Sequence, residues 1–180
     1  MSEKVLRSKG IVKKYGKQEV LHNIDLTLEP GKIYGLIGRN GAGKTTLLSI
    51  LSAQNPATSG EIYLGEEPVW ENPVALQHIF FSREISPNVT GDSSGLKVKD
   101  YLDMAEAYLP KWDKKMAEEL VELFQLDRKK KTLKLSKGML SMLSIVLALA
   151  SKADFTFLDE PVSGLDVVAR EQFYRLLLEE

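Results

Sequence analysis

The sequence contains no cysteine, and it lacks an apolar run long enough to cross a bilayer. The missing cysteine excludes a disulfide framework and a thiolate metal site, which fits the cytosol. The most apolar stretch, residues 139–150, is interrupted by Ser141 and Ser144 and is too short for a spanning helix. The first residues also lack the apolar core of a signal peptide. Any role at a membrane is therefore expected to act through another protein.

The sequence also has almost no net charge, because it contains 24 Lys and Arg residues and 25 Asp and Glu residues. No global field therefore favours nucleic acid or an anionic surface, and we expect no nucleic-acid partner. A local basic run at Lys129, Lys130 and Lys131 is typical of a solvated helix end. A length of 180 residues suits one domain with one core.

A phosphate-binding pattern is present near the N-terminus. Residues 38–45 fit G-x-x-x-x-G-K-[ST], and they follow an apolar run, residues 33–37, that predicts a buried strand. Glycines let the backbone N–H groups turn toward phosphate oxygens, Lys44 can reach the β- and γ-phosphates, and Thr45 can bind Mg²⁺. The alternative is a chance glycine-rich turn. The residues expected around the nucleotide are Gly38, Asn40, Gly41, Ala42, Gly43, Lys44, Thr45 and Thr46.

The remaining pattern predicts an α/β P-loop core with an antiparallel β part and a helical subdomain. Antiparallel strands are expected near residues 5–6 and 21–28, and a loop at 56–60 leads into a strand at 61–64. A helical period runs from residue 98 to 126, after a loop at 86–95. The side chains expected on one face of this helical block are Trp112, Met116, Leu120, Leu123 and Phe124.

Two carboxylates follow a second apolar run. Residues 155–158 favour a β-strand, and Asp159 and Glu160 come directly after it. Ligands bind at this end of the strands in open α/β sheets. Asp159 can hold Mg²⁺ opposite Thr45, and Glu160 can accept a proton from the water that attacks the γ-phosphate. The alternative is an ordinary acidic strand end before the turn at Pro161.

A short motif between these sites indicates a family. The run Leu135-Ser136-Lys137-Gly138-Met139 opens an apolar helix with Ser136 as a natural N-cap. The chain contains, in this order, the P-loop, this run, residues 158–161 and residues 163–166. This order of motifs resembles the nucleotide-binding domain of ATP-binding cassette (ABC) proteins, and the resemblance covers essentially the whole chain. The resemblance implies one domain over 1–180, with 1–84 and 152–180 as the core and 85–151 as the helical subdomain.

The resemblance also implies roles for further residues. Tyr15 matches the family's aromatic residue that stacks on adenine, although a tyrosine can lie there for packing alone. In the family two such domains meet head to tail, so Ser136 and Gly138 are expected to contact the γ-phosphate of ATP bound to the partner's Lys44. Ser163 and Asp166 are expected to cross the interface.

Residues 108–113 together with LSKGM resemble the ATPase subunits of bacterial exporters of the bacitracin-resistance and Ytr type. This likeness implies an ATP- and Mg²⁺-dependent ATPase in a homo- or heterodimer, with a separate transmembrane permease, at the cytoplasmic face of the cell membrane. The cargo is a peptide, an antibiotic or a lipid-like molecule, and the residues do not choose among them.

The sequence departs from the family pattern at two places. Arg83 stands where a glutamine that contacts Mg²⁺ is usual, and Gln77 is a poorer candidate for that glutamine. An arginine cannot ligate Mg²⁺. The chain also ends before the family's switch histidine, and neither His22 nor His78 can replace it. We therefore expect this polypeptide to bind Mg-ATP better than it hydrolyses it. Because the last helix has no stop signal, a shortened form of a longer protein is favoured over a natural short form.

Two other functions share these motifs. A soluble ABC ATPase that works on ribosomes or DNA usually has a second cassette or a long coiled coil, and neither is visible in the sequence. A regulatory module would bind ATP with little turnover, and Arg83 is the feature that favours it.

Overall fold

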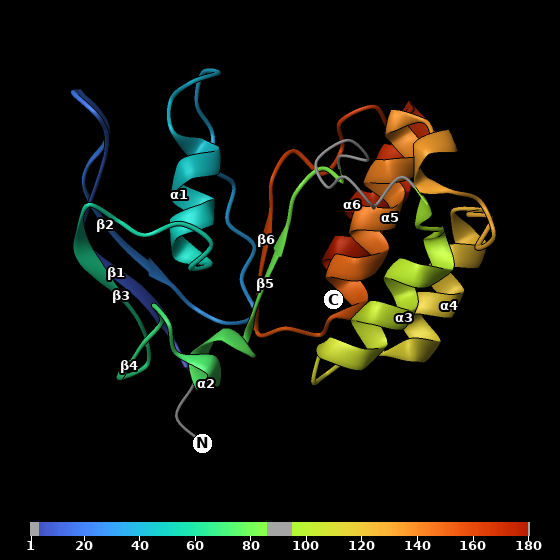
Figure 1. Cartoon of the computed structure of the whole chain (residues 1–180), viewed down its shortest axis with the longest axis horizontal. Helices are drawn as coiled ribbons and strands as arrows, with labels where there is room; N and C mark the ends of the chain where they lie inside the picture. The colour runs from blue at the N-terminus through green and yellow to red at the C-terminus, as the bar shows by residue number, and fades with distance from the viewer. Residues whose placement is uncertain (1–3, 86–94, 180) are drawn as a thin grey trace. The chain divides into compact units, whose positions relative to one another are not determined.

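The structure is a computed structural model that describes residues 4–85 and 95–179 (Figure 1). The chain divides into two compact units, Met1–Phe81 and Ser82–Glu180, and each unit is described separately. The first unit holds the P-loop residues, and the second holds residues 135–139 and the two carboxylates that follow the second apolar run.

The first unit contains a four-stranded antiparallel sheet in the order β2-β1-β3-β4. The strands are β1 (Leu6–Tyr15), β2 (Gln18–Leu28), β3 (Ser59–Leu64) and β4 (Glu67–Pro68). Side chains of β1 alternate between buried and exposed positions, as expected for a strand with one covered face. The expected antiparallel strands are confirmed, although β2 begins at Gln18 rather than at Leu21 and β3 at Ser59 rather than at Glu61.

Two helices and one strand complete the first unit. Helix α1 (Lys44–Leu51) buries Leu47 and Ile50, and it starts directly after the P-loop glycines. Helix α2 (Pro73–Leu76) is capped by Asn72, whose side chain accepts hydrogen bonds from Val74 N and Ala75 N. Strand β5 (Ile79–Ser82) follows, and its last residue belongs to the second unit.

The prediction of a buried strand over residues 33–37 is wrong. The structure assigns no strand there, and the apolar side chains lie exposed, with Ile37 at 96%. Tyr34 is anchored through its hydroxyl, which accepts a hydrogen bond from Glu29 N. An apolar β-favouring run supplies only propensity, because a strand also needs a neighbour that completes its hydrogen-bond ladder. In the described part of the chain, no strand of either sheet pairs with these residues.

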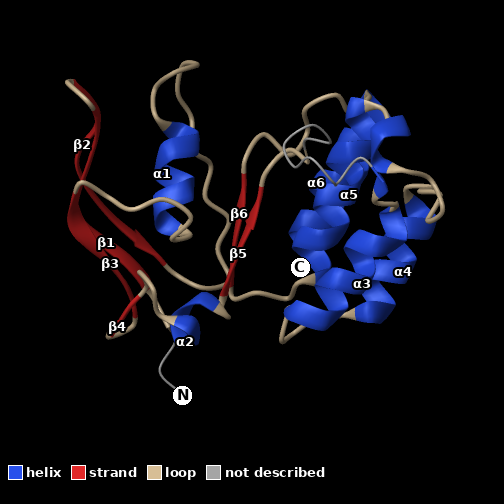
Figure 2. Ribbon diagram, viewed as in Figure 1, coloured by secondary structure: helices blue, strands red, loops and turns tan. Residues whose placement is uncertain are grey.

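The second unit is mainly helical (Figure 2). Its elements are α3 (Val98–Tyr108), α4 (Lys114–Leu123), the 3₁₀ turn η2 (Thr132–Lys134), α5 (Lys137–Ala150), β6 (Phe155–Leu158) and α6 (Val167–Glu179). The expected helical block is present but is broken at Leu109, which precedes Pro110 and adopts an extended conformation. The loop expected at 86–95 lies outside the described residues except for Gly95.

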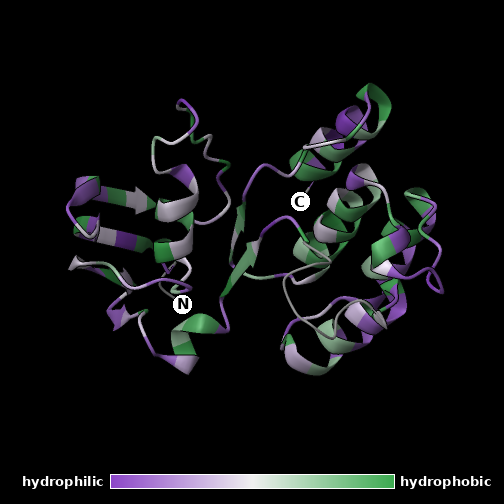
Figure 3. Cartoon of the chain, turned by 45° about the horizontal axis from the view of Figure 1, so that its top comes forward, coloured by the Kyte–Doolittle hydropathy of each residue, from purple (hydrophilic) through white to green (hydrophobic). Residues whose placement is uncertain are grey.

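Helix α5 lies at the centre of the hydrophobic core of the second unit. Leu143, Ile145 and Val146 on α5 are fully buried, and side chains of α3, α4 and α6 pack in the same cluster. The hydropathy colouring of Figure 3 shows how hydrophobic and hydrophilic residues alternate along these helices. An apolar helix of this kind is stable because other helices cover it on several sides.

One residue of the predicted helical face does not belong to it. Leu120 and Phe124 are buried, and Trp112 and Met116 pack partly buried against the core, but Leu123 is 43% exposed. Leu123 is the last residue of α4, and Trp112 lies before that helix begins. One helical period drawn through all five positions therefore does not describe their orientation.

Candidate nucleotide-binding site

The P-loop of the first unit has the local geometry of a phosphate cradle. Gly43 precedes α1 in a left-handed conformation, with φ of 89°, and no side chain caps the first turn of the helix. The N–H groups of that turn point toward this end of the helix, where the helix dipole favours an anion. The Lys44 ammonium donates hydrogen bonds to Gly38 O at 2.8 Å and Arg39 O at 3.1 Å, so it lies over the loop.

Gly43 is required here for two reasons. Its positive φ disfavours any residue with a Cβ. In addition, a Cβ at Gly43 would lie 3.0 Å from Leu21 Cδ2 and 3.1 Å from Val20 Cγ1 on β2. These short distances place the cradle beside the first residues of β2.

Tyr15 lies at the end of β1, in the same unit as the cradle. Its side chain is 50% exposed, and its hydroxyl accepts a hydrogen bond from Asn55 Nδ2 at 2.8 Å. The Lys13 ammonium lies over the ring, 5.1 Å from the centroid. The sequence does not predict the contact with Asn55, because Asn55 is 40 positions from Tyr15 and no motif links the two regions.

The carboxylates of the second unit lie where the sequence predicts them. Strand β6 ends at Leu158, and Asp159 N donates a hydrogen bond to Ser82 O at the end of β5. Asp159 is half-buried and Glu160 is exposed. Glu160 has a positive φ of 49°, a conformation that costs a residue with a Cβ about 1 kcal/mol or more and is concentrated at functional sites.

The expected N-cap of α5 is confirmed. The Ser136 hydroxyl accepts a hydrogen bond from Met139 N at 3.2 Å, and Ser136 is exposed. A hydroxyl that accepts one hydrogen bond can still donate its own proton. Ser136 can therefore cap the helix and bind an anion at the same time.

Two serine side chains of α5 bind the loops on either side of it. Ser141 Oγ donates to Ser163 O at 2.6 Å, and Ser144 Oγ donates to Arg83 O at 3.2 Å. In the sequence these serines are recognisable only as polar interruptions of an apolar run. In the structure their hydroxyls hydrogen-bond the backbone at Arg83 and at Ser163 to the same helix.

Gly138 lies against the loop that contains Ser163. A Cβ at Gly138 would lie 2.6 Å from Gly164 O, a distance that a real Cβ does not adopt. From the family resemblance, Gly138 is expected to contact the γ-phosphate of a partner's ATP. In the structure, Gly138 also allows the first turn of α5 to approach the loop closely.

We expect Gly138→Ala to destabilise the chain by about 1–3 kcal/mol, because the added methyl group displaces the Gly164 backbone. Alanine is about 1 kcal/mol more favourable than glycine inside a helix. The measured loss of unfolding free energy is therefore the packing cost minus this gain. Urea unfolding of the variant measures the effect. Gly95→Ala is the matched control in the same unit, because a Cβ at Gly95 meets nothing within 4 Å. Equal unfolding free energies for the two variants would contradict the packing role.

Each unit contains an oxygen donor of the kind that magnesium prefers. Thr45 in the first unit has a hydroxyl, and Asp159 in the second unit has a carboxylate. In residues 4–85 and 95–179, no group of three metal-binding His, Cys, Asp or Glu side chains forms. A site that shares its metal with phosphate does not need such a group.

The family model described as ABC transporter matches residues 21–163, which include the P-loop, the α5 N-terminus and the β6 carboxylates. The chain belongs to the ABC transporter family. The curated ABC relatives include the ABC transporter ATP-binding protein YtrB of Bacillus subtilis, which is 33% identical over 90% of this chain and 54% of its own length. The bacitracin transport ATP-binding protein BcrA of Bacillus licheniformis is 30% identical over 96% of this chain and 56% of its own.

These comparisons confirm the predicted resemblance to Ytr-type and bacitracin-type ABC proteins. The chain spans somewhat more than half the length of both relatives. A solved ATP-binding subunit of an ABC transporter has a TM-score of 0.82, with 24% identity over 97% of this chain and 74% of its own. The predicted ABC ATPase fold is therefore confirmed. In the described ranges, no helix of this ABC chain combines the length and apolarity needed to span a bilayer.

Proposed function

We propose that this chain is the ATP-binding and ATP-hydrolysing part of the motor subunit of a bacterial ABC exporter. The observation that carries the proposal is the P-loop geometry, in which Lys44 lies over the loop and α1 begins uncapped after Gly43. Membership of the ABC transporter family and the transport names of the relatives support it.

The P-loop residues would bind the triphosphate. Lys44 exchanges its hydrogen bonds to two backbone carbonyls for bonds to phosphate oxygens, which are stronger because the acceptor is charged. Residues 38–46 surround the phosphates with backbone N–H groups. Thr45 and Asp159 would hold Mg²⁺, which neutralises the charge that develops on the phosphates.

Glu160 is proposed as the general base. Its exposed carboxylate at the end of β6 would accept a proton from the attacking water. The strained backbone at Glu160 supports this role, since such conformations persist where surrounding structure holds a functional side chain in one place.

The N-terminus of α5 would contact the ATP of a second domain. Ser136 and Gly138 lie in its first turn, where the hydroxyl proton and the helix dipole favour a phosphate. Ser163 and Asp166 would cross the same interface of a homo- or heterodimer. ATP then holds two such domains together, and hydrolysis releases them.

The partner that we propose is a separately encoded transmembrane permease, which would place the protein at the inner face of the cell membrane. The names of YtrB and BcrA, both transport ATP-binding proteins, support this partner. The proposed cargo class is a peptide, an antibiotic or a lipid-like molecule.

Copurification tests the transport role. We expect the intact protein to copurify in detergent with a membrane protein encoded by a neighbouring reading frame, and ATP hydrolysis to change several-fold in the complex. Lys44→Ala is the control that keeps the contact and loses turnover. An intact protein that hydrolyses ATP at the same rate with and without such a partner would contradict the role.

Arg83 favours a second candidate, an ATP-binding regulatory module with little turnover. Arg83 O is held by Ser144, but its guanidinium cannot ligate Mg²⁺ as a glutamine oxygen can. Steady-state ATP hydrolysis by the intact protein and by its Arg83→Gln variant separates the two candidates. A regulatory module gives slow turnover that the glutamine accelerates, whereas a motor turns over rapidly with arginine in place.

A further inference from the structure

Tyr15 is held by a buried cation and an amide that belong to no known motif of the sequence. Lys13 is a charged residue with only 8% of its surface exposed. Its ammonium donates hydrogen bonds to Asn55 Oδ1 at 3.1 Å and to Pro56 O at 2.6 Å, and it lies over the Tyr15 ring. Asn55 bonds both Lys13 and the Tyr15 hydroxyl, so the three side chains form one network.

The network lies beside the phosphate cradle. Lys13 pairs with Leu21 in the β1–β2 ladder, and Leu21 and Val20 are the residues that a Cβ at Gly43 would meet. Lys13 and Tyr15 project from the same face of β1, because side chains alternate along a strand. A nucleotide with its phosphates at Gly43 therefore has its base within reach of the Tyr15 ring.

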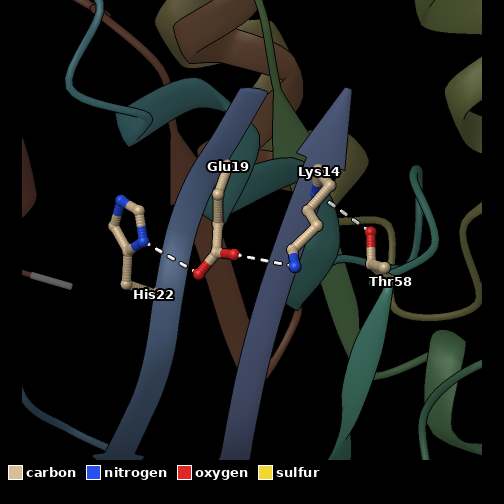
Figure 4. Close-up of polar contacts among 4 residues, drawn as sticks. All are labelled: Lys14, Glu19, His22 and Thr58. Carbon is tan, nitrogen blue, oxygen red and sulfur yellow. Dashed lines mark hydrogen bonds and ion pairs between the residues drawn. The ribbon is translucent and has the colours of Figure 1, made fainter. Parts of the chain in front are cut away.

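A hydrogen bond of the preceding residue holds the backbone beside Tyr15. Lys14 N donates a hydrogen bond to Thr58 Oγ1 at 2.9 Å, and the Lys14 ammonium pairs with Glu19 across the two strands at 3.0 Å (Figure 4). Glu19 also contacts His22 Nδ1 at 2.9 Å. Hydrogen bonds from Lys14 and then His22 hold the pKa of Glu19 below its ordinary value. The exposed Lys14–Glu19 pair contributes little to the position of Tyr15, whereas the hydrogen bond of Lys14 N holds the backbone beside it.

We infer that Lys13 and Asn55 are positioning residues that hold the Tyr15 ring for a purine base. This inference rests on the proposed nucleotide-binding function. A cation over one face of the ring draws electron density toward that face. The opposite face then attracts an electron-rich purine more than a pyrimidine. The Asn55 amide donates a hydrogen bond to the Tyr15 hydroxyl and so holds the ring in place. Less conformational entropy is then lost when a base stacks on the ring.

Three ligands separate this inference from the proposed function. The dissociation constants of Mg-ATP, Mg-CTP and magnesium tripolyphosphate are measured for the intact wild-type protein and for each variant. The unfolding midpoint of each variant is measured as well, to show that the variant is folded. We expect the wild type to prefer ATP over CTP, and Lys13→Met, Asn55→Ala and Tyr15→Phe each to lower that preference about three- to tenfold. Tripolyphosphate affinity stays unchanged, because the P-loop is untouched. Tyr15→Phe removes no charge and no core packing, so it tests the network even where Lys13→Met fails to fold.

Lys14→Met is the matched control in the adjacent lysine, because it removes only the exposed Lys14–Glu19 ion pair and keeps the hydrogen bond of Lys14 N to Thr58 Oγ1. We expect its preference for ATP over CTP to equal that of the wild type. Unchanged base preference in Asn55→Ala and Tyr15→Phe overturns the positioning role while the phosphate site stands. A wild type that binds none of the three ligands overturns the proposed function, and this inference with it.

Discussion

Lys44→Ala is expected to weaken Mg-ATP binding by about 10²- to 10⁴-fold, because each hydrogen bond from a charged group to phosphate is worth about 1.5–3 kcal/mol. In the structure the Lys44 ammonium makes two hydrogen bonds to loop carbonyls, so it is already placed over the position proposed for the phosphates. Isothermal titration of the intact protein with Mg-ATP measures the loss.

The control for this variant is Lys115→Ala. Lys115 is an exposed lysine of α4 that pairs with Glu119, and it lies far from the P-loop in sequence. The two variants have the same net charge, so a general electrostatic effect would weaken both. A Lys44→Ala protein that binds Mg-ATP as tightly as Lys115→Ala would disprove the phosphate role of Lys44.

Glu160→Gln is expected to slow ATP hydrolysis by about 10²- to 10⁴-fold, the usual contribution of a general base, while ATP binding is retained. Glutamine keeps the size of the side chain but cannot accept the proton. Bound ATP then persists, and we expect the intact protein to elute as a dimer with Mg-ATP and as a monomer without it. Phosphate release and size-exclusion chromatography measure the two effects.

Glu171→Gln serves as the control, since Glu171 is an exposed glutamate on α6. It should hydrolyse ATP at the wild-type rate and show no ATP-dependent dimer beyond that of the wild type. Rapid hydrolysis by Glu160→Gln would assign the base to another residue. Slow hydrolysis without a dimer would keep Glu160 as the base and reject the clamp.

Local features of the site follow directly from short stretches of sequence. The Ser136 N-cap of α5 and the end of β6 before Asp159 agree with the predictions. The N-cap depends on a hydrogen bond within three residues, which a serine determines without distant partners. The composition of residues 155–158 favours a strand, although β6 also needs β5 as its neighbour.

The incorrect predictions have the opposite character. Residues 33–37 have the composition of a buried strand, but neither their pairing nor their burial is a property of five residues. Leu123 has the spacing of a core residue, but it is the last residue of α4 and is 43% exposed. Both features depend on neighbours that composition does not specify.

The sequence by itself determined the chemistry of this protein: a P-loop lysine, two carboxylates after a strand and a serine-capped helix, in the order of the ABC family. Only the tertiary structure decided that Lys13 and Asn55 hold Tyr15, and that Ser141 and Ser144 bind the loops of Ser163 and Arg83. The reason is that a motif encodes bonds between near neighbours, whereas these contacts join residues 22 to 61 positions apart. Their partners meet only once the strands pair and the helices pack.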